Sequence, residues 1–141
     1  MEVKCATSFD ERFDPNNVLN KYTWDQLIEY RDMKKFWMTT GLYPQEMLID
    51  LGGSKSINEV RFSVTGARKI IIEGCKTTNA SEFKKVGESK DLTNKQGVVQ
   101  TDTVKLSEPA PYSLLKFIIQ DGWEDFSSVH TIEFNWEESF I

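Results

Sequence analysis

The sequence predicts an all-β protein that folds as a jelly-roll sandwich. Apolar and polar residues alternate with a period of two in several short runs, which is the pattern of strands with one buried and one exposed face. Turn-forming residues separate these runs at regular intervals, so about seven or eight short strands fit along the chain. Because 141 residues is the usual size of one domain, we expect residues 1–141 to form a single β-sandwich.

The predicted strands follow one another through the second half of the chain. The alternating runs lie at 60–64, 98–106, 114–119 and 132–136. Residues 69–73 and 116–120 instead hold three consecutive apolar residues between polar ones, as in strands that are covered on both faces. We therefore expect these two segments to be central strands.

Turn signals mark the connections between the predicted strands. They lie at 52–54, 65–66, 78–81, 94–97, 109–111 and 121–122. The first of them, Gly52-Gly53-Ser54, is followed by Lys55 and Ser56 and so has some likeness to a phosphate-binding loop. The first glycine of that motif is missing and no helical pattern follows, so we interpret it as a hairpin turn.

One segment breaks the β pattern. Thr23 and Gln26 have the spacing of a capping box, and Trp24, Leu27 and Ile28 follow at helical spacing. The spacing predicts a short amphipathic helix over 24–34. We expect its apolar side to close one end of the sandwich.

Composition argues against several classes of partner and compartment. The net charge of −5 lacks the clustered Lys and Arg that nucleic-acid binding needs. The apolar runs are far shorter than a membrane-spanning helix, so we expect no membrane insertion and no signal peptide. Cys5 and Cys75 lie far apart and outside any metal-type pair, which favours reduced thiols in a cytosolic compartment.

The sequence offers no arrangement of residues that favours catalysis. His130 is the one histidine, which argues against mechanisms that need two imidazoles, and no Gly-x-Ser-x-Gly motif places a nucleophile. Asp121, Glu124 and Asp125 lie close together, but we interpret them as a solvated loop rather than a paired acid and base. We therefore expect a protein that is not an enzyme.

The carboxyl-terminal segment predicts a surface for a protein partner. Residues 121–141 contain six acidic residues and no Lys or Arg, and aromatic residues lie between the acids. Trp123 occupies a turn and Phe140 lies next to the end of the sequence, where burial is less assured. Acidic charge with aromatic anchors suits a basic, partly apolar partner protein.

Residues in the middle of the chain resemble a known fold family. The pattern is similar to that of discoidin or coagulation-factor type C domains: Trp37, then Gln45 before Ile49-Asp50-Leu51-Gly52, then Ile57, Val60 and Phe62. That resemblance implies a galactose-binding-like jelly roll in which the tryptophan packs at one end of the barrel. It says little about the ligand.

A narrower resemblance covers most of the chain. The stretch Phe36-Trp37-Met38-Thr39-Thr40-Gly41-Leu42-Tyr43-Pro44-Gln45-Glu46 resembles the intraflagellar transport protein 25 family, also described as small heat-shock-like proteins. Leu115–Ile119 and the segment Phe126-Ser127-Ser128-Val129-His130 resemble the same family. The resemblance implies a non-catalytic subunit of intraflagellar transport complex B, located in the cilium or flagellum and the cytoplasm.

The family resemblance also implies the partners. These are a Rab-like small GTPase, the intraflagellar transport protein 27 homologue, and other complex-B subunits. We expect the partner surface to combine the family stretch with the acidic and aromatic segment. The expected partner-binding residues are Thr39, Thr40, Tyr43, Trp123, Phe126, His130, Trp136, Glu137, Glu138 and Phe140.

Some members of that family bind calcium through a loop that precedes Phe-Trp. Asn17 and Asn20 occupy the first part of this loop and are the candidate ligands. Asn20 replaces an acid, Lys21 replaces a glycine and Lys35 replaces a threonine, and the predicted helix splits the loop. A hard cation needs several oxygens and negative ligand charge, so these departures weigh against calcium, and we expect no cofactor.

Two other functions remain open. A discoidin-type module that binds a glycan or a phospholipid head group is the main alternative, although its extracellular relatives often join their ends by a disulfide. A substrate-recruiting subunit of a ubiquitin ligase shares the fold. Binding to a glycan array or to anionic vesicles would favour the first alternative, whereas capture of a small GTPase would favour the transport protein.

Overall fold

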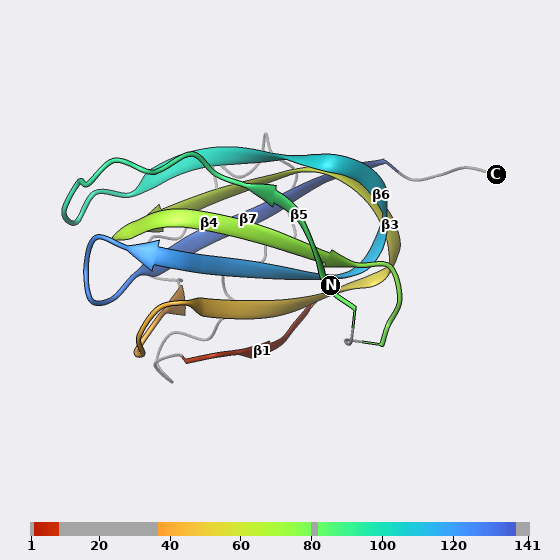
Figure 1. The fold of residues 1–141 in the computed structure, drawn as a ribbon, viewed down its shortest axis with the longest axis horizontal. Helices are drawn as coiled ribbons and strands as arrows, with labels where there is room; N and C mark the ends of the chain where they lie inside the picture. The colour runs from red at the N-terminus through yellow and green to blue at the C-terminus, as the bar shows by residue number, and fades with distance from the viewer. Residues whose placement is uncertain (1, 9–36, 80–81, 138–141) are drawn as a thin grey trace.

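The computed structural model in Figure 1 is a sandwich of antiparallel strands. It describes residues 2–8, 37–79 and 82–137. Over these ranges the chain forms seven strands and no helix, which confirms the predicted all-β class. The helix predicted over 24–34 lies outside the described residues. The strands are β1 (Glu2–Ala6), β2 (Trp37–Met38), β3 (Gln45–Thr65), β4 (Ala67–Cys75), β5 (Lys84–Glu88), β6 (Gln100–Gly122) and β7 (Ser128–Glu137).

Two long strands, β3 and β6, take part in both layers of the sandwich. In one layer, the first part of β3 lies between β1 and the last part of β6. The last part of β6 also pairs with β4, and β4 pairs with β5, which is the outermost strand of this layer. In the other layer, the second part of β3 lies between the first part of β6 and β7, and β7 also pairs with β2. The predicted central strands at 69–73 and 116–120 are confirmed, because β4 lies between β5 and β6, and β6 between β3 and β4.

The turns predicted at 52–54 and 109–111 are wrong, because both segments lie inside strands. At Gly52 and Gly53 the backbone φ angles are 74° and 131°, values that glycine adopts without a steric penalty. The register between β3 and β6 shifts between Asp50 and Lys55 at the same place. The strands bend here from one sheet into the other, as at the corners of packed sheets.

The hydrophobic core fills the space between the two layers. Val60, Phe62 and Val64, which alternate along β3, all have at most 1% of their surface exposed, as the period of two predicts. Phe62 contacts Phe117 of the other layer edge to face, with ring centroids 5.7 Å apart. Trp37 is fully buried, and its indole Nε1 donates a hydrogen bond to the carbonyl of Ser8 at 2.7 Å.

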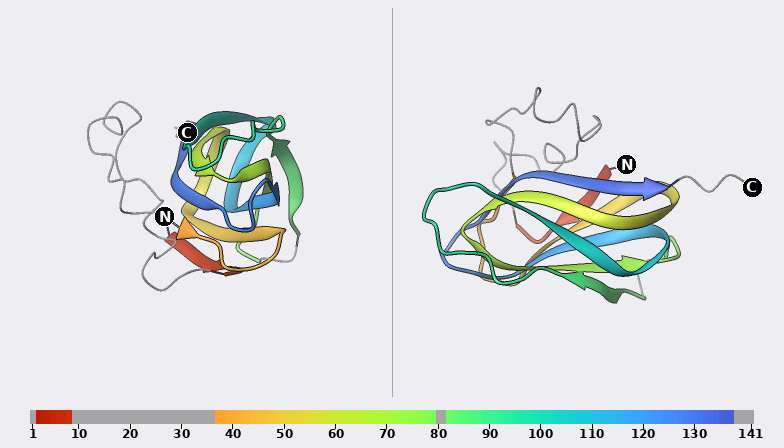
Figure 2. Two further views of the ribbon diagram at one scale, coloured as in Figure 1. Left: turned by 90° about the vertical axis from the view of Figure 1, so that its left-hand side faces the viewer. Right: turned by 90° about the horizontal axis from the view of Figure 1, so that it is seen from above.

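The connections gather at the two ends of the sandwich, as Figures 1 and 2 show. Four connections meet at the end drawn on the left of Figure 1, which we call the loop end, and they comprise residues 39–44, 66, 89–99 and 123–127. The opposite end, which we call the corner end, holds the bends of β3 and β6 and the connection between β4 and β5.

Candidate interaction surface

Large apolar side chains are exposed on three of the connections at the loop end. Leu42 is 89% exposed, Phe126 55%, Val98 51% and Trp123 43%. We call these four side chains the loop-end patch. Trp123 and Phe126 also line an open depression of about 560 Å³ together with Gln96, Gly97, Glu124 and Asp125. Large exposed apolar side chains at one end of a domain, two of them lining a depression, indicate an interaction site.

Trp123 is held in a fixed orientation although its ring is partly exposed. Its indole Nε1 donates a hydrogen bond to the carbonyl of Leu92 at 2.9 Å, and its backbone N–H donates to the carbonyl of Gly66 at 2.8 Å. The Arg68 guanidinium lies over the ring, 5.1 Å from its centroid. A contact residue that is already ordered loses less conformational entropy on binding.

The connection that carries Phe126 is tied to the neighbouring connection at 39–44. The Tyr43 hydroxyl donates to the carbonyl of Glu124 at 2.8 Å and lies 2.6 Å from the Ser127 hydroxyl. Thr39 N–H donates to the carbonyl of Ser127 at 2.9 Å, and Ser127 N–H donates to Thr39 Oγ1 at 3.0 Å. These bonds hold two loops of the surface in one arrangement before any partner arrives.

The Tyr43 phenol keeps its proton in this setting. Burial raises the pKa of Tyr43 above its ordinary value, the hydrogen bond with Ser127 opposes that rise, and the negative charges of Glu124, Asp121 and Asp125 add to it. The neutral hydroxyl can therefore act as the donor to the Glu124 carbonyl at every physiological pH.

The raised pKa of Tyr43 predicts a loss of stability in alkaline solution. A pKa that is higher in the folded state stabilises the fold below the unfolded-state value of about 10, and this stability is lost as the pH rises through the folded-state pKa. Urea unfolding between pH 8 and pH 11 should show the loss. In Tyr43→Phe the loss should be smaller but still present, since the pKa of Tyr112 is also raised by burial. Equal losses in the two proteins would contradict this assignment.

Acidic side chains lie beside the two aromatic rings of the loop-end patch. Arg68 pairs with Asp91 and Asp121, in both cases with 3.4 Å between nitrogen and oxygen. Glu124 and Asp125 belong to the same short connection as the two aromatic rings. The depression beside the two rings is lined by these two carboxylates and by no Lys or Arg, which favours a partner with basic residues.

The structure brings five of the predicted partner-binding residues to the loop end: Thr39, Thr40, Tyr43, Trp123 and Phe126. Thr40, Trp123 and Phe126 are exposed and Tyr43 is half-buried. Thr39 has no exposed surface, so its predicted contact with a partner is corrected to a supporting role beneath the surface. His130 is half-buried in β7, with its Nε2 3.0 Å from the Ser128 hydroxyl.

Trp136 does not join this surface. It lies near the corner end, where the Lys55 ammonium is 5.0 Å from its ring centroid. Because β7 runs from Ser128 at the loop end to Glu137 at the corner end, the predicted acidic and aromatic segment is divided between the two ends. Glu138, Phe140, Asn17 and Asn20 lie outside the described residues, as does the side chain of Glu137.

Sequence reasoning missed three residues of this surface. Leu42 is an apolar residue between Gly41 and Tyr43-Pro44, and a leucine inside such a turn-rich stretch is a usable signal of exposure. Val98 was predicted to begin a strand, but β6 begins at Gln100, and Val98 N–H donates to the carbonyl of Lys95 in the preceding turn. No pattern in the sequence indicated that Arg68 lies on Trp123.

Two features are absent from the part of the chain that the structure describes: a cluster of metal-ligating side chains and a membrane-spanning helix. In residues 2–8, 37–79 and 82–137, no group of three or more His, Cys, Asp or Glu side chains is placed to hold a metal ion. The same residues form no helix with the length and apolar character that crossing a membrane requires.

Curated proteins with similar sequences share one name. Intraflagellar transport protein 25 of Chlamydomonas reinhardtii is 31% identical over 130 residues, which are 92% of this chain and 62% of that protein. The intraflagellar transport protein 25 homologue of Mus musculus is 29% identical over 131 residues, covering 93% of this chain and 83% of the relative. The chain thus spans about three-fifths of the length of the algal relative. No family model matches the sequence.

Solved structures with the same architecture are jelly-roll domains. The family 32 carbohydrate-binding module of Clostridium perfringens NanJ, solved with galactose, has a TM-score of 0.68 and 15% identity over 94% of this chain and 91% of the module. Reduced XRCC1, solved bound to the DNA polymerase β catalytic domain, has a TM-score of 0.70 and 9% identity. The match covers 98% of this chain and 97% of the matched chain in that structure. At such low identity the likeness shows the fold alone, and it confirms the predicted galactose-binding-like jelly roll.

Proposed function

Because the chain is a homologue of the proteins named intraflagellar transport protein 25, we propose that it works in intraflagellar transport as a non-catalytic, partner-binding subunit. The proposal extends to membership of complex B, to pairing with a Rab-like small GTPase, the intraflagellar transport protein 27 homologue, and to a location in the cilium or flagellum and the cytoplasm. Similarity over more than nine-tenths of the chain to relatives of that name supports it.

The observation that carries a partner-binding role is the loop-end patch. Interfaces are built around a few aromatic anchors that are surrounded by polar groups. Here Trp123 and Phe126 are the anchors, and Glu124 and Asp125 lie between them in the chain. The hydrogen bonds to Leu92, Gly66 and Tyr43 order the loops in advance. We propose that the GTPase docks here with an apolar pocket flanked by Lys or Arg.

The alternative function is glycan binding at the same end of the sandwich. It is favoured by the partly exposed Trp123 ring next to the carboxylates of Glu124 and Asp125, because an aromatic face and nearby oxygens suit a sugar. A carbohydrate-binding module with the same fold was solved with galactose. Against this alternative, the Arg68 guanidinium already lies over the Trp123 ring and takes space that a stacked sugar would need.

Co-expression with the Rab-like intraflagellar GTPase of the same organism tests the proposal. Size-exclusion chromatography with light scattering should give the mass of a one-to-one complex. The double variant Trp123→Ala, Phe126→Ala should weaken capture by roughly 100-fold, since aromatic anchors dominate interface energies. Trp136→Ala is the matched control, because it removes a similarly exposed ring near the corner end and should leave the affinity unchanged.

Two results would contradict the proposal. If the double variant binds the GTPase as tightly as the unmodified chain, the loop-end patch is not the interface. If no complex forms and the chain instead binds galactose-type sugars on a glycan array, the alternative function replaces the proposed one. Circular dichroism of each variant must show an unchanged fold, because only then does a loss of affinity report on the surface.

A further inference from the structure

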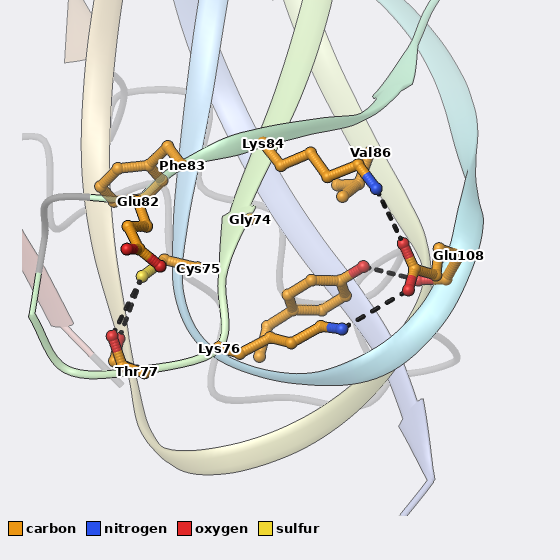
Figure 3. A pocket seen from close by; sticks show the side chains of 10 residues that line it. Gly74, Cys75, Lys76, Thr77, Glu82, Phe83, Lys84, Val86 and Glu108 are labelled. Atoms are coloured by element: carbon orange, nitrogen blue, oxygen red, sulfur yellow. Dashed lines mark hydrogen bonds and ion pairs between the residues drawn. The ribbon is translucent and has the colours of Figure 1, made fainter.

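A second cleft, drawn in Figure 3, lies at the corner end of the sandwich, remote from the loop-end patch. It has a volume of about 490 Å³ and is partly enclosed by the connection between β4 and β5 and by the bend of β6. The residues that matter for its chemistry are Gly74, Lys76, Phe83, Lys84, Glu108 and Tyr112. The resemblance and the proposed transport function make no use of it.

The floor of the cleft is rigid. Tyr112 is 1% exposed, and its hydroxyl donates a hydrogen bond to the backbone carbonyl of Glu108 at 2.6 Å. Its ring lies against Gly74, where an added Cβ would come within 2.7 Å of two ring carbons. The glycine thus lets the ring pack against the backbone of β4, and the shape of the cleft exists before any ligand binds.

Two ammonium groups converge on one carboxylate at the rim. Lys76 Nζ lies 3.4 Å from Glu108 Oε1, and Lys84 Nζ lies 3.4 Å from Glu108 Oε2, as Figure 3 shows. All three side chains are about half exposed or more, and these distances exceed those of strong charge-assisted bonds. At this rim the two ammonium groups leave one positive charge in excess of the Glu108 carboxylate, whereas the second carboxylate of the cleft, Glu82, lies on the side of Cys75 and Thr77 in Figure 3. A carboxylate from a partner would therefore meet two ammonium groups whose ion pairs with Glu108 are long and exposed to solvent.

The surroundings of this rim favour an extended peptide over a small anion. The half-buried Phe83 ring forms one wall, with the Lys116 ammonium 4.4 Å from its centroid. The cleft opens beside β5, the last strand of the sheet path, and sheet edges are places where extended segments dock. β5 begins with Lys84 and Lys85 and ends with Glu88, which pairs with Lys85 at 2.8 Å, so the excess positive charge of this edge lies at its start, beside the cleft.

We propose that this cleft binds an acidic, extended segment of a partner protein. A carboxylate of that segment takes the place of the Glu108 carboxylate between Lys76 and Lys84, and an adjacent apolar side chain lies against Phe83. The site is independent of the proposed GTPase surface, because it lies at the other end of the sandwich. One chain can then hold two partners at once, as a subunit of a larger assembly must.

Fluorescence anisotropy with an end-blocked, labelled peptide of alternating Glu and Val residues with a central Phe tests this proposal. Lys76→Glu with Lys84→Glu should weaken binding by at least about tenfold, since both donors to the carboxylate are lost. Glu108→Gln should tighten binding about threefold or more, because the internal competitor loses its charge while the carbonyl that accepts from Tyr112 is kept. Lys90→Glu with Lys95→Glu, an exposed double change of the same total charge in the connection that follows β5, is the matched control and should have little effect.

The Glu108 variant makes the test decisive. If Glu108→Gln leaves the affinity unchanged or lowers it, the two lysines serve only to pair with Glu108, and the proposal is overturned. Binding of dextran sulfate as tight as that of the peptide, with no effect of Phe83→Ala on either, would mean that the cleft responds to charge alone and would also overturn it. The lysine variants should still capture the GTPase, so failure here is distinguishable from failure of the proposed function.

Discussion

Replacing Phe62 by alanine is expected to lower the free energy of unfolding by about 3–5 kcal/mol, the usual cost of removing a buried ring and leaving a cavity. Phe62 has no exposed surface and contacts Phe117 across the sandwich, so its ring links the two layers. Because the surrounding strands are fixed by pairing on both sides, they cannot close the space completely. Urea unfolding followed by tryptophan fluorescence measures the change.

Phe126→Ala makes the same chemical change on the surface and serves as the control. Phe126 is 55% exposed, so its removal should change the free energy of unfolding by no more than about 0.5 kcal/mol. The two variants should therefore separate stability from binding: Phe62→Ala unfolds more easily, whereas Phe126→Ala stays folded and loses affinity for the partner. Similar losses of stability in both would contradict the placement of the two rings.

Gly66→Ala should have the second largest effect, about 3 kcal/mol, through strain in the backbone and a steric clash. Gly66 has a φ of 71°, where an alanine is strained whatever the space around it. An added Cβ would also lie 2.8 Å from the backbone carbonyl oxygen of Phe126. The 123–127 connection must then move, which weakens the bond from Trp123 N–H to the Gly66 carbonyl. Partner affinity should therefore fall together with stability.

Gly97→Ala separates the two causes. Gly97 has almost the same φ, 72°, but nothing lies within 4 Å of an added Cβ. Only the backbone strain remains, so the loss of stability should be about 1–2 kcal/mol, smaller than for Gly66→Ala. Thermal unfolding of the two variants side by side measures the difference. Equal losses would mean that the contact with the Phe126 carbonyl carries no cost.

The strands could be predicted from the sequence because their signal is local. The alternation along β3 and the apolar centres of β4 and β6 record which faces are covered, and the structure places these residues in the core and at the middle of the sheet. The turn predicted at 52–54 failed for a different reason. Two glycines with positive φ suit both a hairpin and a strand corner, and only the pairing of β3 on both sides of them decides between the two.

The exposure of side chains at the loop end was predictable in part. Trp123 lies in a turn-rich acidic stretch, and that local context correctly indicated an exposed ring. Trp136, which we expected in the partner surface, lies at the opposite end of the sandwich from the loop-end patch, because ten residues of β7 carry it there, about 30 Å away for an extended strand. The burial of Thr39 depends on Ser127, far away in the sequence, and had no local signal.

The sequence by itself determined the fold class, the covered faces of the strands and the similarity to intraflagellar transport proteins, because alternation and local motifs are properties of neighbouring residues. Only the tertiary structure decided which loops share an end, how Tyr43 and Arg68 support the exposed rings, and that Lys76 and Lys84 meet at Glu108. Those contacts join residues that lie far apart in the chain. They arise where antiparallel strands return to the same end of the sandwich, and the pattern of residues within a short segment cannot predict which segments meet there.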